Sequence, residues 1–260
     1  MDLQLAGKIA LVGGGSDGIG YGIARELARE GCSVALMARR LPALEAAASR
    51  LQAEITSRVI PVQGDCRKAD DITRAVDTIV GHFGGLDILI NNDGAPPLGE
   101  LSSFDDVAWS NAVERNLMYV VRASRAAIPH MKARGGGSIL NIISGVAVQP
   151  KENFGLCSAT WAGVLSYAKT LAIEVGKFRI TVNTIMSGLI ETPRAEKVVF
   201  TKDGTDIEAE RQRRISLIPV RRVGQVGDIG ALAALLVSPR GSFISGTAVQ
   251  VDGGILAHVR

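Results

Sequence analysis

Short apolar runs alternate along the chain with longer stretches in which apolar residues recur at helical spacing. Seven of the short runs are rich in valine, isoleucine and leucine and are bounded by glycine or polar residues, as β-strands are. The predicted strands are residues 9–13, 33–38, 59–63, 86–91, 138–143, 180–185 and 248–251. Several of them are continuously apolar rather than alternating, which is typical of parallel strands covered by helices on both faces.

Helical periodicity follows most of these runs. The predicted helices are residues 19–30, 42–55, 70–83, 104–133, 161–176 and 229–236. This alternation indicates an α/β chain with a Rossmann-type doubly wound fold, in which about seven parallel strands are flanked by helices on both faces. No boundary interrupts it, so we expect residues 1–260 to form a single domain. Residues 187–219 lack a strong period and follow a late strand, which predicts a substrate lid over the ligand crevice.

Composition narrows the function classes. The chain has 260 residues, 47% of them apolar, and a formal net charge of only +3, with no long basic run, so a nucleic-acid partner is not expected. Three scattered cysteines make neither a disulfide framework nor a C-x-x-C metal site. No apolar run reaches about 18 residues and no leader is evident, so we expect a cytoplasmic protein without a membrane partner or a metal.

A glycine-rich turn joins the first predicted strand to the first predicted helix. It reads Gly13-Gly14-Gly15-Ser16-Asp17-Gly18-Ile19-Gly20. Without bulky side chains such a turn lets backbone N–H groups approach a pyrophosphate, whose charge is favoured at a helix N-terminus. A plain tight turn is the alternative, but the strand–turn–helix context favours dinucleotide binding. The candidate binding residues are Gly14, Ser16, Gly18, Ile19 and Gly20.

The end of the second predicted strand indicates which dinucleotide is bound. An acidic residue at this point would take the adenosine ribose hydroxyls of NAD, whereas here Ala38 is followed by Arg39 and Arg40. Two guanidinium groups suit the 2′-phosphate of NADP, so the predicted cofactor is NADP(H) rather than NAD(H). The alternative is that both arginines belong to an exposed loop, and Asp17 would oppose additional negative charge.

Six further segments follow the glycine-rich turn in a specific order. They are Asp65, Asn91-Asn92-Asp93-Gly94, Asn116, Ser144, Ser187-Gly188-Leu189-Ile190-Glu191-Thr192 and Val251-Asp252-Gly253-Gly254. Together they resemble the short-chain dehydrogenase/reductase family over essentially the whole chain, and within it the 3-oxoacyl-ACP reductase-like members. The resemblance implies that Asp65 holds the adenine ring, that Asn92 and Gly94 line the cofactor crevice, and that Ile190 and Thr192 lie at the nicotinamide carboxamide.

The same resemblance implies an altered catalytic centre. Ser144 matches the family's catalytic serine and Asn116 the asparagine of its long central helix. The family's Tyr-x-x-x-Lys pair, however, aligns without a gap between flanking Ser-Ala and Ala-Gly dipeptides on Cys157 and Trp161. In the family the lysine cation lowers the tyrosine pKa from about 10. An indole carries no charge, and a thiol is shorter than a phenol and a weak donor.

Three functions stay open from the sequence. The first is NADP(H)-dependent hydride transfer to or from a small carbonyl or alcohol, in which Ser144 and Asn116 orient the carbonyl and Cys157, Asp93 or a water supplies the proton. The second is a non-redox isomerase, dehydratase or lyase that reuses the pocket. The third is a nucleotide-binding or oligomer-partner protein with little catalysis. Under all three the resemblance implies a homo-oligomer, a tetramer or a dimer.

Overall fold

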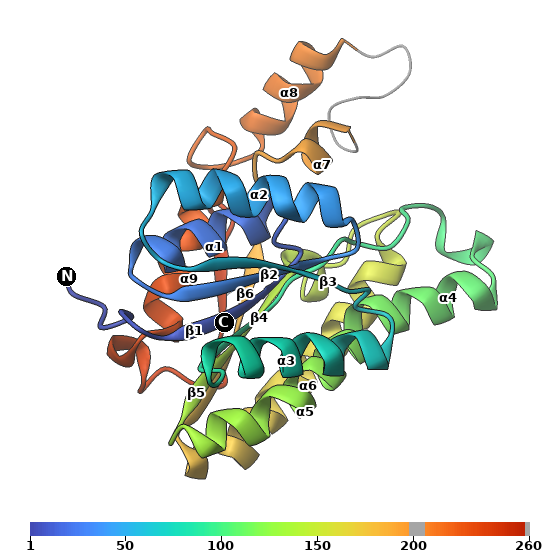
Figure 1. The fold of residues 1–260 in the computed structure, drawn as a ribbon. Helices are drawn as coiled ribbons and strands as arrows, with labels where there is room; N and C mark the ends of the chain where they lie inside the picture. The colour runs from blue at the N-terminus through green and yellow to red at the C-terminus, as the bar shows by residue number, and fades with distance from the viewer. Residues whose placement is uncertain (198–205, 258–260) are drawn as a thin grey trace.

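Seven parallel strands form one sheet at the centre of the computed structural model (Figure 1), which describes residues 1–197 and 206–257. Across the sheet the strands follow the order β3-β2-β1-β4-β5-β6-β7. Their bounds are Ile9–Gly13 (β1), Ser33–Ala38 (β2), Val59–Gln63 (β3), Ile88–Asn91 (β4), Gly137–Ser144 (β5), Ile180–Ser187 (β6) and Ala248–Val251 (β7). The chain starts in the middle of the sheet, reaches one edge at β3, and returns to build the other half from β4. This doubly wound order confirms the predicted fold class.

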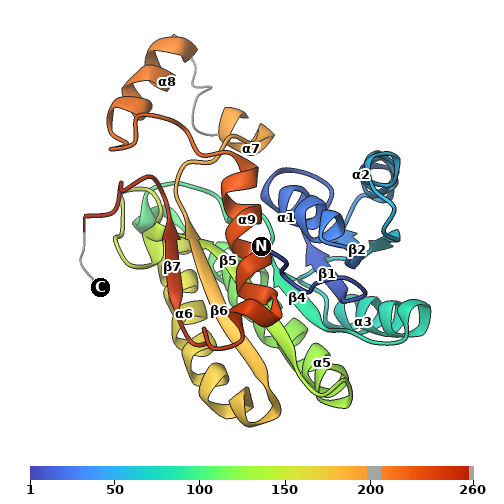
Figure 2. The same cartoon turned by 90° about the vertical axis from the view of Figure 1, so that its left-hand side faces the viewer.

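Helices cover both faces of the sheet (Figures 1 and 2). One face carries α1 (Gly18–Arg29), α2 (Leu41–Glu54) and α9 (Val226–Val237), and the other carries α3 (Ala69–Phe83), α5 (Tyr119–Ala133) and α6 (Gly155–Val175). Successive strand residues point to opposite faces, so Ile9 and Leu11 enter one hydrophobic core while Ala10 and Val12 enter the other. Two cores explain why the strands are apolar at nearly every position.

The remaining elements are short and lie between the main ones. They are α4 (Asp106–Val113), η2 (Glu114–Met118), α7 (Pro193–Ala195), α8 (Ile207–Ser216) and the 3₁₀ turns η1 (Leu101–Ser103), η3 (Gly145–Ala147), η4 (Gly176–Phe178) and η6 (Pro239–Gly241). No helix within residues 1–197 and 206–257 is both long and apolar enough to cross a bilayer.

The helix predicted over residues 104–133 is confirmed from Asp106 onward, and it contains one π-helical turn. Asp105 caps α4 by accepting a hydrogen bond from the Ala108 N–H, and the helix then widens into the π-helical turn η2 before α5 begins at Tyr119. A π-helical turn adds one residue to the local repeat and redirects the side chains that follow. In this chain the turn contains Asn116, whose side chain reaches α6.

The helix predicted to begin at residue 161 begins six residues earlier, at Gly155. Glycine, serine and threonine are weak helix formers, so propensity alone does not place residues 155–160 in a helix. Burial does, because Leu156, Cys157 and Thr160 all lie on the buried side of α6. Packing has overridden local preference here.

Residues 188–197 and 206–219 follow the end of β6. In both views α8 extends beyond the strand ends, whereas α7 lies close to the start of α1 (Figures 1 and 2). Asp206 caps α8 by accepting from the N–H groups of Glu208 and Ala209. Residues 198–205 of the expected lid lie outside the described residues, so the lid stays a prediction.

Candidate functional site

The glycine-rich turn has a backbone that only glycine fits well. Gly14 and Gly18 have φ angles of +61° and +58°, in the left-handed region. A Cβ on Gly20 would come within 2.4 Å of the Gly14 carbonyl oxygen. Asp17 caps α1 by accepting a hydrogen bond from the Gly18 N–H at 2.7 Å. Asp17, whose negative charge would oppose a bound phosphate, therefore has a structural role at the start of α1.

Asn92, which directly follows β4, holds the glycine-rich turn in place. Its side-chain nitrogen Nδ2 donates to the Gly13 carbonyl oxygen at 3.1 Å. The same nitrogen would lie 2.6 Å from a Cβ on Gly14 and 2.7 Å from one on Gly20. Because β1 and β4 are neighbours where the strand order reverses, Asn92 fixes the turn at the crevice where ligands of doubly wound sheets bind.

Tyr119, the first residue of α5, takes space that a side chain at position 13 would need. A Cβ on Gly13 would lie 2.0 Å from the Tyr119 hydroxyl oxygen and 2.7 Å from the Asn92 carbonyl oxygen. Burial raises the pKa of Tyr119 well above its ordinary value, and the nearby Cys66 and Asp93 raise it further. Sequence reasoning missed Tyr119; the only signal was the glycine at position 13, where the family usually has threonine.

A pocket of about 160 Å³ runs from this turn to the end of β2. Its lining includes Gly14, Ser16, Arg39, Arg40 and Asn92. Both arginines are exposed, and neither forms an ion pair within the described part of the chain. The pocket thus combines a turn of backbone N–H groups with two available cations, which fits the pyrophosphate and 2′-phosphate of NADP.

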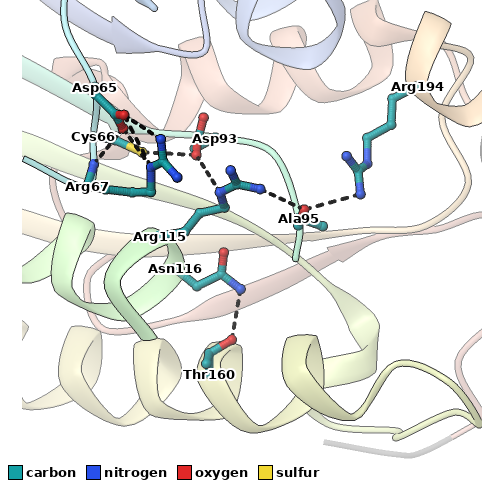
Figure 3. Close-up of polar contacts among 9 residues, drawn as sticks. All are labelled: Asp65, Cys66, Arg67, Asp93, Ala95, Arg115, Asn116, Thr160 and Arg194. Atoms are coloured by element: carbon teal, nitrogen blue, oxygen red, sulfur yellow. Dashed lines mark hydrogen bonds and ion pairs between the residues drawn. The ribbon is translucent and has the colours of Figure 1, made fainter. Parts of the chain in front are cut away.

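Asp65 lies at the same end of the site but not in the lining of that pocket. Its carboxylate accepts from Arg67 Nε at 3.0 Å and from Nη2 at 2.6 Å. These hydrogen bonds lower the pKa of Asp65 to about 2 (Figure 3). Its role at an adenine ring stays a prediction.

A second pocket, of about 200 Å³, lies at the ends of β4, β5 and β6. Its lining brings together predicted site residues from five segments of the chain: Ile19, Asn92, Gly94, Ser144, Trp161, Ile190 and Thr192. Pairing in the sheet sets Ser144 opposite Ser187, whose hydroxyl donates to the Ile143 carbonyl oxygen at 3.0 Å. The Ser144 hydroxyl makes no hydrogen bond to any residue the structure describes, so it is available to a ligand.

The two pockets adjoin. Asn92 and Asp93 line both of them. A Cβ on Gly18 would lie 3.4 Å from the Thr192 methyl carbon, so the segment after β6 also meets the glycine-rich turn. One extended ligand can therefore run from Arg39 and Arg40 along the turn to Ser144.

Two of the predicted catalytic residues do not line this pocket. Cys157 has no exposed surface, and burial raises its pKa to about 11 although the positive charge of Arg194 opposes the shift. Asn116 is also buried, and its Nδ2 donates to the Thr160 hydroxyl at 2.8 Å (Figure 3). Thr160 in turn donates to the Leu156 carbonyl oxygen at 2.7 Å. The side-chain amide of Asn116 ties the π-helical turn to α6.

A row of polar groups runs from Cys66, which lines the first pocket, to Arg194, which lines the second (Figure 3). The Cys66 thiol donates to the Asp93 carboxylate at 3.0 Å, and Arg115 Nε lies 3.6 Å from the same oxygen. Arg115 Nη1 then donates to the Ala95 carbonyl oxygen at 3.2 Å, and Arg194 Nη2 donates to it at 3.3 Å. Sequence reasoning gave no role to either arginine. Among the described residues no cluster of acidic, histidine or cysteine side chains could hold a metal.

Comparison with known proteins agrees with this geometry. The family profile described as enoyl-(acyl carrier protein) reductase matches residues 14–256. Dehydrogenase/reductase SDR family member 4 from Homo sapiens is 33% identical over 254 residues, which span 96% of this chain and 88% of the human protein. The 3-oxoacyl-(acyl-carrier-protein) reductase of Chlamydia muridarum is 32% identical over 98% of this chain and all of its own length. The chain belongs to the short-chain dehydrogenase/reductase family, a family of oxidoreductases.

Among solved structures, the chain is similar to L-sorbose reductase from Gluconobacter frateurii, determined with NADPH and L-sorbose bound. The two chains cover each other completely, with a TM-score of 0.96 and 34% sequence identity.

Proposed function

We propose that this chain binds NADP(H) and transfers a hydride to or from a small carbonyl or alcohol substrate, in a site that works without a Tyr-x-x-x-Lys pair. The observation that carries the proposal is that the glycine-turn pocket and the Ser144 pocket adjoin and share Asn92 and Asp93. A dinucleotide held at the first pocket extends to the second. When bound, NADP(H) supplies or accepts the hydride.

Preference for NADP(H) over NAD(H) is supported by Arg39 and Arg40, and by the NADPH in the similar L-sorbose reductase structure. Hydrogen bonds to a charged group contribute about 1.5–3 kcal/mol each. Arg39→Ala with Arg40→Ala is expected to weaken NADPH binding by about tenfold or more in calorimetric titration, and to leave NADH binding nearly unchanged. Arg125→Ala, at an exposed arginine on α5, is the control. An equal loss for both nucleotides contradicts the preference.

Ser144 is the group that polarises the substrate oxygen. Ser144 lines the pocket and its hydroxyl can donate a hydrogen bond to a carbonyl, while Trp161 and Phe154 add apolar surface that lowers the local dielectric and so strengthens such a bond. Cys157 is buried with a raised pKa, so it is a poor proton source. We assign the proton to water in the pocket, with the Asp93 carboxylate, which lines both pockets, as the acceptor in the direction of alcohol oxidation.

A screen of carbonyl compounds that follows NADPH consumption tests this assignment. Removing one oxyanion-type donor typically lowers kcat by about 10²–10³-fold, so Ser144→Ala is expected to lose at least about 10²-fold. Ser166→Ala, at an exposed serine on α6, is the matched control. The described residues that line the Ser144 pocket include no tyrosine that could titrate, so kcat is expected to be flat between about pH 6 and 9. Activity that survives Ser144→Ala contradicts the proposal.

A second candidate function is nucleotide binding with little catalysis. It is favoured by the lining of the second pocket, in which the described residues include Trp161 but neither a lysine nor a tyrosine. On this account Cys157→Tyr combined with Trp161→Lys creates reductase activity in a protein that had none, while NADPH affinity changes little. Turnover by the native protein, with no gain in the double variant, contradicts this second candidate.

A further inference from the structure

Two arginine side chains converge on one backbone carbonyl at the second pocket. Arg115 comes from η2 and Arg194 from α7, and both donate to the Ala95 oxygen (Figure 3). A guanidinium has five N–H donors, so a single carbonyl satisfies only a small part of its capacity. Arg194 lines the pocket. Its side chain is thus held in place while most of its donors are free for a ligand.

The charges around this point do not balance. Asp93 is the only acidic residue among the described lining residues, and it already accepts from Cys66 and pairs with Arg115. Glu191, close by in the sequence, forms an ion pair with Arg211. Within the described residues Arg194 has no acidic partner. One positive charge without an acidic partner among the described residues therefore lies at the pocket.

The rest of the lining is largely apolar. Leu98, Phe154, Trp161 and Leu189 contribute carbon surface around the Ser144 hydroxyl. The positive charge of Arg194 also acts on the buried thiol of Cys157, where it opposes the rise in pKa caused by burial. The pocket thus combines a hydrogen-bond donor, an apolar wall and a fixed cation.

We propose that the substrate of this pocket is an oxo acid or hydroxy acid with an apolar body, whose carboxylate is bound by Arg194 while its carbonyl or hydroxyl oxygen meets Ser144. The inference rests on the proposed function for the reaction and adds the substrate class. In reduction the carbonyl carbon gains the hydride, its oxygen gains a proton from a pocket water that takes a proton back from the solvent, and NADPH is oxidised to NADP⁺. The planar guanidinium of Arg194 suits the two oxygens of a carboxylate.

The test uses matched pairs of acid and ester on the full chain. Benzoylformate, phenylpyruvate and pyruvate are each compared with their methyl esters, first by calorimetric binding to the protein saturated with NADP⁺, in which no reduction occurs, and then by turnover with NADPH. A charge-assisted hydrogen bond of about 1.5–3 kcal/mol predicts that at least one apolar acid binds about tenfold or more tightly than its ester.

Variants of Arg194 test whether this residue causes the preference for an acid over its methyl ester. Arg194→Met is expected to remove it, and Arg194→Lys to keep part of it, because a lysine retains the charge without the planar fork. Arg240→Met is the control, since Arg240 is also exposed and also donates to a single backbone carbonyl, that of Asp2, at 3.2 Å. A preference that survives in Arg194→Met overturns the proposal.

Failure of this inference is distinguishable from failure of the proposed function. If no acid in the series binds more tightly than its ester, whether both bind equally or neither binds, the carboxylate proposal is overturned. Reduction of the esters in that case leaves hydride transfer at Ser144 standing. If NADPH itself does not bind in a separate titration, it is the proposed function that fails.

Discussion

The contact between Gly13 and Tyr119 allows a sharp test of how the nucleotide turn is built. In Gly13→Ala the new Cβ would lie 2.0 Å from the Tyr119 hydroxyl oxygen and 2.7 Å from the Asn92 carbonyl oxygen. Real Cβ atoms do not approach heavy atoms so closely, and one of the two neighbours is backbone. The turn or the start of α5 must therefore shift.

Overpacking a filled interior by such a group typically costs about 1–3 kcal/mol. For a chain of this size that corresponds to a fall in Tm of roughly 2–10 °C. NADPH affinity is expected to fall as well, because Asn92 and the turn it holds move together. Thermal unfolding followed by circular dichroism, with NADPH titration alongside, measures both effects.

Two further variants make the reasoning refutable. Gly81→Ala lies inside α3 where a Cβ meets nothing within 4 Å, so this control is expected to gain up to about 1 kcal/mol of helix stability. Tyr119→Leu combined with Gly13→Ala removes the hydroxyl, and the pair should cost less than the sum of the two single changes. A Gly13→Ala protein with native Tm and native NADPH affinity refutes the account of this contact.

Three other predictions follow from the buried and paired groups. Thr160→Val leaves the Asn116 amide without its acceptor and is expected to lower the free energy of unfolding by about 1–3 kcal/mol. Thr160→Ser retains the hydroxyl and should keep most of the native stability. Equal stability of the valine and serine variants in urea unfolding contradicts this prediction. Cys157, buried with a pKa of about 11, should resist alkylation at pH 8 until the protein unfolds, and rapid labelling seen by mass spectrometry would contradict its burial. Arg67→Met should return the Asp65 pKa from about 2 towards about 4, so the stability that this pair provides is present above about pH 4 and is lost as the pH falls through about 2. Unfolding curves of both proteins between pH 2 and 6 check this, and a difference that does not shrink at low pH contradicts it.

Much of the fold follows from hydrophobic patterning alone. The central strands β1 and β4 are buried at every position, so a continuous apolar run such as that of β4 is a strong signal. All seven predicted strands are confirmed to within about two residues at their ends. The first and last residues of a helix are harder to predict from the sequence, because they depend on packing. Gly155 begins α6 although glycine is a weak helix former, because Leu156, Cys157 and Thr160 are buried.

Some features of the candidate site could likewise be predicted from the sequence, and others could not. Gly14, Gly18 and Ser144 could be predicted, because a turn before a helix and a serine at a strand end are local patterns whose place in the fold is fixed by topology. The contact of Tyr119 with Gly13 could not be predicted from the sequence. The same holds for the hydrogen bonds of Arg115 and Arg194 to the Ala95 carbonyl oxygen. These contacts join segments far apart in the sequence, and no local spacing encodes them.

The most direct test of hydride transfer at Ser144 is the fate of a deuterium label. NADPH carrying deuterium at both positions of the reactive carbon of the nicotinamide is incubated with the protein and the carbonyl series, and the alcohol products are analysed by mass spectrometry. We predict that native protein and Ser166→Ala both yield an alcohol with one deuterium on the former carbonyl carbon, and that Ser144→Ala yields about 10²-fold less in the same time. Tight NADPH binding with no deuterium in any product from the native protein would contradict the central claim.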